Sequence, residues 1–253
     1  MYAISTKLVV LGINGLDYRY VDLYAPILKQ KDWHVYEVPD IYCHSTMKIP
    51  ISVLIWSSII TGKNPRELGI SVKDVWKQKE VRIKKDILTL FDIVPESVGL
   101  FIPGYNPHPK YWMEDLKALV EKCFKDDVEG RNARLKYYTI TYGIFNEQRD
   151  VLFREVLRNR KLIFIHFNII DALSHVFTQD HEYVKIAYRE VSGLVPRLYS
   201  HGYDVLIVSD HGFEGHSHSR YAFVSFNKKL PFKPKDPKGI FNLILTILGY
   251  KNI

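Results

Sequence analysis

The sequence is poor in cysteine and contains no long apolar run. Cys43 and Cys123 are its two cysteines among 253 residues, and they have neither zinc-ligand spacing nor the density of a disulfide-stabilised secreted domain. No stretch approaches the roughly 18 apolar residues of a membrane-spanning helix. The N-terminal residues lack the apolar region and cleavage site of a signal peptide. These absences favour a cytoplasmic protein without a membrane span.

The charge balance is basic but does not identify a partner. A formal net charge of +7 can indicate an anionic partner. The lysines and arginines are spread along the chain, however, and no nucleic-acid-binding motif is present. A nucleic-acid-binding module is therefore only a third alternative, supported by net charge alone, and the oligomeric state stays open.

Length and composition favour a single domain over residues 1–253. A hydrophobic content of 47% and a charged content of 25% are ordinary for a globular protein. The Pro- and Lys-rich stretch 228–238 predicts a surface connection. The apolar residues 239–253 that follow predict a C-terminal helix docked on the domain, with a membrane anchor as the alternative interpretation.

Short apolar runs alternate with longer segments of helical periodicity, a pattern that predicts βαβ units around a mostly parallel sheet. Continuous apolarity indicates strands covered on both faces, and therefore a three-layer α/β/α fold. The predicted strands are Lys7–Ile13, Ser97–Ile102, Lys161–Phe167 and Tyr203–Ser209, with weaker signals at Trp33–Val38 and Ala222–Phe226. The predicted helices are Tyr18–Gln30, Ser57–Thr61 with a short extension, Ile87–Val94, Trp112–Phe124, Thr141–Arg158 and Tyr183–Ser200.

Polar side chains follow three of the predicted strands, at the point where each strand ends. Asn14 follows the first, Asp171 and His175 follow Lys161–Phe167, and Asp210 and His211 follow the strand from Tyr203. Ligands of open α/β sheets bind beyond the carboxyl ends of the strands, so we expect these side chains to meet at one edge.

The residue types at this edge are those of a metal site. The D-x-x-x-H spacing of Asp171 and His175 places both on one face of a helix. His216 or His218 could complete the same site. Carboxylate and imidazole ligands without a thiolate fit zinc, manganese or iron.

Ser57 is a candidate nucleophile within the segment 49–70. It is expected at or just inside a helix N-terminus, where unpaired amides and the helix dipole stabilise an oxyanion or a phosphate. From this stretch alone, the favoured interpretation is that Ser57 or Ser58 is a helix N-cap.

Taken together, these motifs resemble the alkaline phosphatase superfamily, and within it the type I phosphodiesterase/nucleotide pyrophosphatase family. The resemblance runs from about Lys7 to about Asn227. It rests on LVVLGINGL at 8–16, SVLIWSSIITGKNPRELGI at 52–70, the strand and Pro-rich loop within 89–109, DALSH at 171–175 and SDHG at 209–212.

The resemblance implies a two-metal site with a serine nucleophile. Ser57 falls on the nucleophile position, and Lys63 and Asn106 are candidate substrate contacts. One divalent ion would be held by Asp171, His175 and His218, with His216 as the alternative, and the other by Asp210, His211 and Asn14. Zn²⁺ is the expected metal, with Mn²⁺ or Fe as alternatives. Asn14 stands where the family has an aspartate, which Asp17 could replace if the loop turned back.

The implied function is metal-dependent hydrolysis of a small-molecule phosphate ester or nucleotide, by a phosphodiesterase or nucleotide pyrophosphatase. The alternatives are a phosphomonoesterase, sulfatase, phosphonate hydrolase or phosphomutase of the same superfamily, or a non-catalytic binding protein because Asn14 replaces the aspartate. The chain leaves little room for a cap between Ile70 and Val94.

Overall fold

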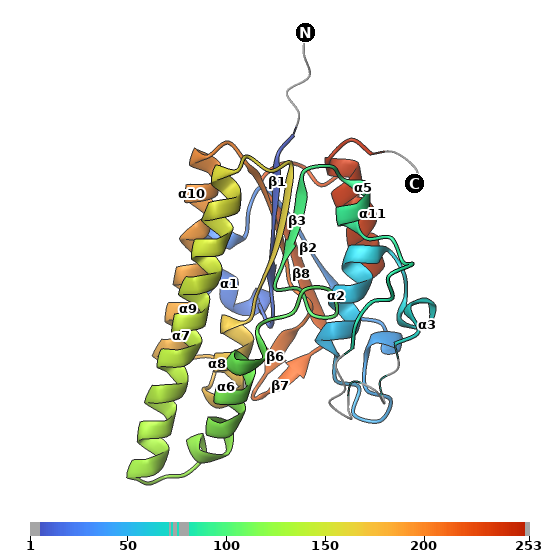
Figure 1. Ribbon diagram of the computed structural model, residues 1–253. Coiled ribbons are helices and arrows are strands. Elements are labelled where there is room, and N and C mark those ends of the chain that lie inside the picture. The colour runs from blue at the N-terminus through green and yellow to red at the C-terminus, as the bar shows by residue number, and fades with distance from the viewer. Residues whose placement is uncertain (1–5, 71, 73–74, 76–80, 251–253) are drawn as a thin grey trace.

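A mainly parallel sheet forms the centre of the molecule, as predicted (Figure 1). The computed structural model describes residues 6–70, 72, 75 and 81–250. In this part of the chain the main sheet has six strands in the order β2-β8-β5-β1-β4-β3, and β8 is antiparallel to both of its neighbours. The strands are β1 (Leu8–Ile13), β2 (Asp32–Glu37), β3 (Ser97–Leu100), β4 (Leu162–Phe167), β5 (Asp204–Val208) and β8 (Tyr221–Phe226). A separate hairpin consists of β6 (Gly212–Glu214) and β7 (Ser217–Ser219).

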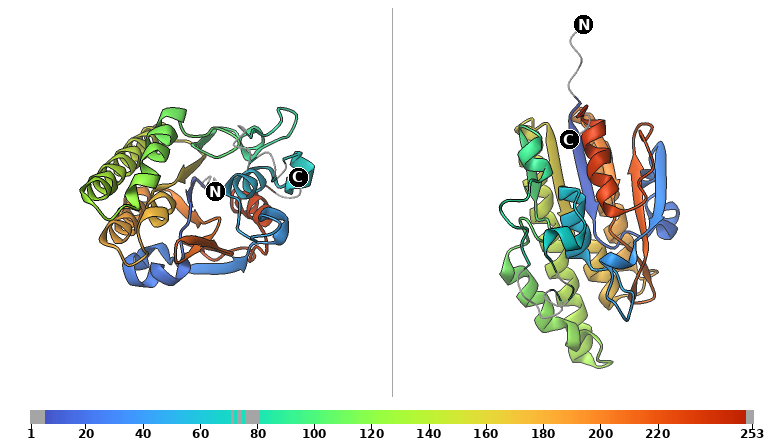
Figure 2. Two further views of the ribbon diagram at one scale, coloured as in Figure 1. Left: turned by 90° about the horizontal axis from the view of Figure 1, so that it is seen from below. Right: turned by 90° about the vertical axis from the view of Figure 1, so that its right-hand side faces the viewer.

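Helices cover both faces of the sheet, giving the three layers seen in Figure 2. One face packs against α1 (Tyr18–Tyr24), α7 (Val128–Leu157), α8 (Ile169–Val176), α9 (Glu182–Ser192) and α10 (Leu194–Ser200). The other packs against α2 (Ser52–Thr61), α3 (Pro65–Leu68), α5 (Leu90–Ile93) and α11 (Pro237–Ile247). Short 3₁₀ turns occupy Pro26–Leu28 and Asp40–Tyr42, and α6 (Lys110–Cys123) pairs with α7.

Successive residues of each central strand enter opposite cores. Val9 and Leu11 of β1 lie in the core with α7 to α10, whereas Leu8 and Val10 lie in the core with α2 and α11. Every residue of β1 and of β4 is buried. This two-sided burial explains why these strands are continuously apolar rather than alternating.

Several predicted helices have different boundaries. The predicted helix 18–30 ends at Tyr24 because Pro26 follows it closely. The predicted helix 183–200 is divided at Gly193 into α9 and α10. Asp127 caps α7, which starts 13 residues before the predicted Thr141 and covers 30 residues. The β6–β7 hairpin was not predicted.

The C-terminal helix packs against α2, as expected for a docked helix. It begins at Pro237, inside the stretch predicted as a connection, because the Asp236 side chain caps its first turn by accepting a hydrogen bond from the Gly239 amide. Within the described part of the chain, every helix is too short or too polar to span a bilayer. The segment between Ile70 and Val94 lies partly outside the described residues.

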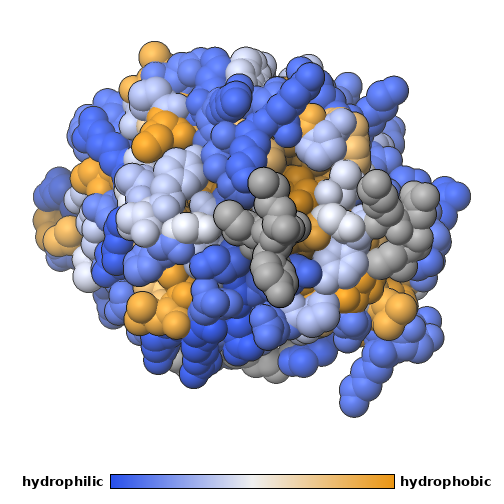
Figure 3. Space-filling model, turned by 90° about the horizontal axis from the view of Figure 1, so that it is seen from above, coloured by the Kyte–Doolittle hydropathy of each residue, from blue (hydrophilic) through white to orange (hydrophobic). Residues whose placement is uncertain are grey.

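The carboxyl ends of the central strands lie level with one another. Gly12 of β1 pairs with His166 of β4 and with Val208 of β5, so the three strands end within one residue of the same height. The paired helices α6 and α7 project beyond this edge (Figure 1). The opposite end of the molecule is mainly hydrophilic with scattered apolar patches (Figure 3).

Candidate active site

Side chains from separate segments meet at the carboxyl edge of the sheet. Asn14 follows β1, Asp171 and His175 lie on α8 directly after β4, and Asp210 and His211 follow β5. His218 lies on β7 of the short hairpin. The expected convergence of these residues is therefore present in the structure.

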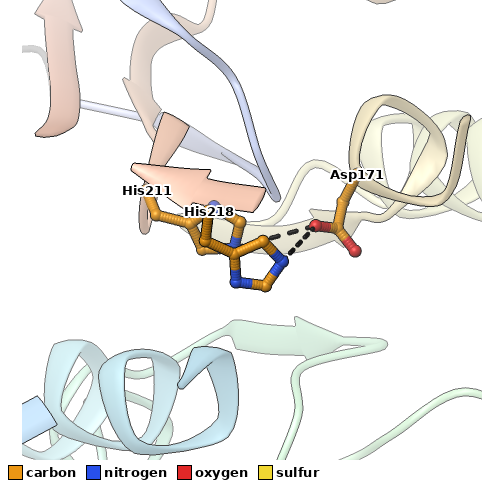
Figure 4. Close-up of side chains that lie close together, drawn as sticks. All are labelled: Asp171, His211 and His218. Atoms are coloured by element: carbon orange, nitrogen blue, oxygen red, sulfur yellow. Dashed lines mark ion pairs between the residues drawn. The ribbon is translucent and has the colours of Figure 1, made fainter. Parts of the chain in front are cut away.

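One half of the cluster consists of Asp171, His175 and His218. Asp171 Oδ1 lies 3.5 Å from His175 Nε2 and 3.4 Å from His218 Nε2. The two imidazole Nε2 atoms are 3.1 Å apart. Figure 4 shows Asp171 pointing from α8 toward the histidines of the hairpin region.

The other half contains Asn14, Asp210 and His211, together with Ser52, the first residue of α2. The Ser52 hydroxyl is 3.3 Å from Asn14 Oδ1 and 3.3 Å from His211 Nε2. His211 Nε2 is 3.5 Å from Asp210 Oδ2, and Asp210 Oδ1 accepts a hydrogen bond from the Gly15 amide. The halves touch, since Asp171 Oδ1 lies 3.7 Å from His211 Nε2.

Backbone carbonyls orient two of the histidine rings. His211 Nδ1 lies 3.0 Å from the Gly212 carbonyl oxygen, and His218 Nδ1 lies 3.2 Å from that of Pro50. A neutral ring that donates through Nδ1 has an unprotonated Nε2, whose lone pair is then directed at the cluster. This is the arrangement in which outer partners orient metal-binding histidines.

Burial and mutual charge set the protonation of the cluster. Burial raises the pKa of Asp210 to about 7, with the nearby Asp171 charge adding to the effect. Burial opposes ionisation of Asp171 too, but His175 and His218 outweigh it and lower the pKa of Asp171. Burial lowers the pKa of His211 to about 3. At neutral pH the ionised Asp171 and the neutral His211 are in the states that coordinate cations.

The donor set fits divalent metal ions. Asp171 Oδ1 and Asp210 Oδ2 are buried and have no hydrogen-bond partner among the residues that the structure describes, a costly condition unless a cation satisfies them. Ligand atoms of Asp171, His211 and His218 lie within 4.8 Å of one another. The mixture of carboxylate and imidazole without thiolate suits zinc, manganese or iron.

The predicted position of Ser57 at a helix N-terminus is wrong. Helix α2 begins at Ser52, so Ser57 lies in its interior, fully buried and without a side-chain hydrogen bond. Its hydroxyl faces Gly104, where an added Cβ would come within 2.5 Å of Ser57 Oγ. Ser57 is therefore a packing residue in the α2 core layer, not part of the cluster.

Ser52 was not predicted as a site residue, although Pro50 before it indicates where the helix can begin. Pro50 cannot occupy a helix interior because it lacks an amide proton and its ring clashes with the preceding turn. A helix that begins directly after Pro50 places Ser52, not Ser57, in its first turn. The structure agrees, with Ile51 as N-cap in an extended conformation. Asn168 was also missed: its Oδ1 accepts a 2.6 Å hydrogen bond from Asn14 Nδ2, which directs Asn14 Oδ1 to Ser52.

The structure separates the alternatives left open for two ligands. Asn14 faces Ser52, whereas the Asp17 carboxylate accepts hydrogen bonds from Arg19 and from the Phe213 amide. His218 lies in the cluster, whereas His216 is exposed in the turn between β6 and β7.

The two predicted substrate contacts are not drawn into the cluster. Lys63 is exposed just beyond the C-terminal end of α2, whereas Ser52 begins that helix, so Lys63 lies about one helix length from the cluster. A ten-residue helix is about 15 Å long. Asn106 is exposed in the loop after β3 and donates a hydrogen bond to the Gly99 carbonyl.

Comparison with solved structures relates this arrangement to known folds. The structure of alkaline phosphatase from the Antarctic bacterium TAB5 aligns over 97% of this chain and 98% of that chain, with a TM-score of 0.59 and 11% sequence identity. The chain has the alkaline phosphatase fold. A mutant of the TAB5 enzyme with Mg bound aligns with a TM-score of 0.55 at 10% identity, again over 97% and 98% of the two chains. The PH0037 protein from Pyrococcus horikoshii aligns with a TM-score of 0.50 at 10% identity, over 99% of each chain.

A protein-family model matches a shorter part of the chain. Residues 114–219 match the family described as the BREX system PglZ alkaline phosphatase-like domain. This range contains Asp171, His175, His211 and His218, but neither Asn14 nor Ser52. No protein with a curated description matches the sequence.

Proposed function

We propose that the chain is a metal-dependent hydrolase of phosphate esters, with phosphodiesters or nucleotide pyrophosphates as its substrate class. The observation that carries this proposal is the position of the Ser52 hydroxyl, 3.3 Å from both Asn14 Oδ1 and His211 Nε2. The same His211 Nε2 lies 3.7 Å from Asp171 Oδ1 and 3.5 Å from Asp210 Oδ2, two carboxylate oxygens without a hydrogen-bond partner in the described part of the chain. A hydroxyl next to cation ligands is the arrangement required for phosphoryl transfer to a protein side chain.

Two groups of residues would hold the ions. Asp171, His175 and His218 would bind one ion, and Asp210, His211 and Asn14 would bind the other, which also lies beside Ser52. Zn²⁺ is the ion that we expect, with Mn²⁺ or Fe as alternatives. Bound ions in such sites lower the pKa of a neighbouring hydroxyl and neutralise charge on phosphoryl oxygens.

Ser52 takes the nucleophile role that the sequence interpretation gave to Ser57. Its Oγ forms a bond to phosphorus while the bond to the leaving oxygen breaks, and the leaving group departs with a proton as an alcohol or a nucleotide. Water then cleaves the phosphoserine and restores the Ser52 hydroxyl.

The N-terminal end of α2 supports this chemistry. The first backbone amides of a helix have no intrahelical acceptor, so those at Ser52 and Val53 are available to phosphoryl oxygens. The Ile51 side chain does not cap this turn. The amides and the dipole of α2 thus favour negative charge beside Ser52.

Turnover by the purified chain tests the proposal. The protein is stripped with a chelator, reloaded with Zn²⁺ or Mn²⁺, and assayed with bis-p-nitrophenyl phosphate, p-nitrophenyl phosphate and p-nitrophenyl sulfate. We expect metal-dependent hydrolysis with the diester preferred. Equal turnover with and without metal would refute the mechanism, whereas preference for the monoester or the sulfate would refute the substrate class alone.

A further inference from the structure

The aromatic side chain of Phe213 supports three histidines of the cluster. It is fully buried on β6, and its ring centroid lies 5.2 Å from that of His175, 5.7 Å from that of His211 and 5.2 Å from that of His218. All three contacts are edge-to-face, which fixes ring orientation as well as distance. A single apolar side chain therefore contacts histidines from both halves of the candidate metal site.

The backbone of Phe213 is held by a charged pair at the start of α1. The Phe213 amide donates a 2.9 Å hydrogen bond to Asp17 Oδ2, and the Arg19 guanidinium donates to the Phe213 carbonyl. Asp17 and Arg19 are themselves an ion pair at 2.7 Å, in which the Asp17 side chain is 1% exposed. Asp17 also caps α1 by accepting from the Arg19 amide. These bonds tie the β6–β7 hairpin to the segment after β1.

The space around Phe213 leaves no room for adjustment on the side of Gly15. A Cβ added to Gly15 would lie 2.7 Å from Phe213 Cε2. The glycine thus permits a close approach between the turn after β1 and the ring that supports the histidines.

The hairpin cannot fix the histidine positions by its own pairing. Its strands β6 and β7 have three residues each and pair only with one another in the described part of the chain. Isolated two-stranded hairpins are marginally stable. An external anchor is therefore needed to hold His218 at a defined distance from His211 and His175.

We propose that Phe213, with the Asp17–Arg19 pair that holds its backbone, is the positioning device that sets the spacing of His175, His211 and His218. The proposal rests on the metal site of the proposed function and adds residues that bind neither metal nor substrate. Partners that orient metal ligands in this indirect way typically contribute 10- to 100-fold to metal affinity. Loss of the Phe213 ring should weaken metal binding by a factor in this range.

Metal titration of variants tests the proposal. Dissociation constants for Zn²⁺ and Co²⁺ are measured by chelator competition, and the visible spectrum of the Co²⁺ form reports ligand geometry. We expect Phe213→Ala and Asp17→Ala to bind about 10- to 100-fold more weakly with an altered Co²⁺ spectrum. Phe213→Leu and Asp17→Asn, which keep apolar volume and one acceptor oxygen, should show smaller changes in the same direction and cover the case in which an alanine variant fails to fold.

Asp22→Asn is the matched control. Asp22 also lies on α1, but its side chain is 58% exposed and pairs with Lys29, so the metal affinity and Co²⁺ spectrum of this variant should equal those of the wild type. Variants with a lower Tm but wild-type affinity and spectrum would overturn the positioning role while leaving the proposed function intact. A wild-type chain that binds neither Zn²⁺ nor Co²⁺ would overturn both.

Discussion

Ser52 and Ser57 lie in one helix and have opposite environments. Ser52 begins α2 and places its hydroxyl beside Asn14 and His211. Ser57 is completely buried, its hydroxyl has no partner, and it packs against the loop after β3. Two serines in one sequence motif can therefore differ in position, and the motif alone does not show which hydroxyl lies beside the cluster.

Helix geometry explains the difference. Five residues advance about 7.5 Å along the axis and about 140° around it, so the two hydroxyls point in different directions, one to Asn14 and His211 and the other to Gly104. Only the first turn of a helix presents unpaired amides. The end of α2 at the sheet edge is thus suited to chemistry, and its interior is suited to packing.

Replacing the two serines one at a time tests directly which of them is required for turnover. Ser52→Ala should reduce kcat for bis-p-nitrophenyl phosphate by about a thousandfold or more, since the nucleophile is lost. Ser57→Ala should stay within about threefold of the wild type, with an equal or higher Tm because a buried unpaired hydroxyl is removed. The reverse pattern of rates would return the nucleophile role to Ser57.

Asp171→Asn tests whether the reactive end of α2 depends on the carboxylate shared by both halves of the cluster. Asp171 Oδ1 lies within 3.7 Å of three histidine Nε2 atoms. Loss of its charge should weaken Zn²⁺ binding by several hundredfold, more than the loss of an orienting partner. Glu155→Gln, which alters a carboxylate paired with Arg158 and Arg160 instead, serves as the control in a chelator competition assay.

The stability of the core beside Ser57 should respond to pH through His108 and His166, since the His166 ring packs against Trp56, the neighbour of Ser57, and the His108 ring packs against His166. Burial lowers the pKa of His108 to about 4 and also depresses the pKa of His166. Below pH 6.5 the unfolded chain binds a proton at His108 that the folded chain rejects until about pH 4. The free energy of unfolding should therefore fall as pH decreases through this window, by up to about 3 kcal/mol from His108.

Urea unfolding at pH 7 and pH 4.5 measures this effect. His108→Phe should lose less stability on acidification than the wild type, whereas replacement of the exposed His201 by Gln should not alter the difference. An identical loss in His108→Phe and in the wild type would show that His108 does not carry the pH dependence.

Asn14→Asp tests how the charge beside Ser52, at the N-terminal end of α2, affects metal binding. An added negative charge beside Ser52 should tighten binding of the second ion by about tenfold, or roughly 1.4 kcal/mol. The gain is limited because Asn168 Oδ1, which now accepts from Asn14 Nδ2, would face a carboxylate until the Asn168 amide turned. Chelator competition measures the change, and an unchanged or weaker affinity would contradict the expected charge effect.

Much of the architecture was predictable from local patterns. The strands β1, β4 and β5 were recognised because burial on both faces leaves continuous apolar runs. The carboxyl-edge rule then placed Asp171 and Asp210 at one edge without any distance information. The hairpin of β6 and β7 escaped prediction because three-residue strands carry too little periodicity to be recognised.

The sequence alone determined the parallel sheet and the edge at which its polar residues gather, since these follow from hydrophobic periodicity and strand direction. The tertiary structure alone decided that Ser52 rather than Ser57 lies beside the cluster and that the Asp17 carboxylate holds the Phe213 amide, and it agrees with the sequence in placing His218 rather than His216 in the cluster. Those choices depend on where a helix begins and on which side chains from distant segments fill the same space, and local patterns do not specify contacts between distant segments.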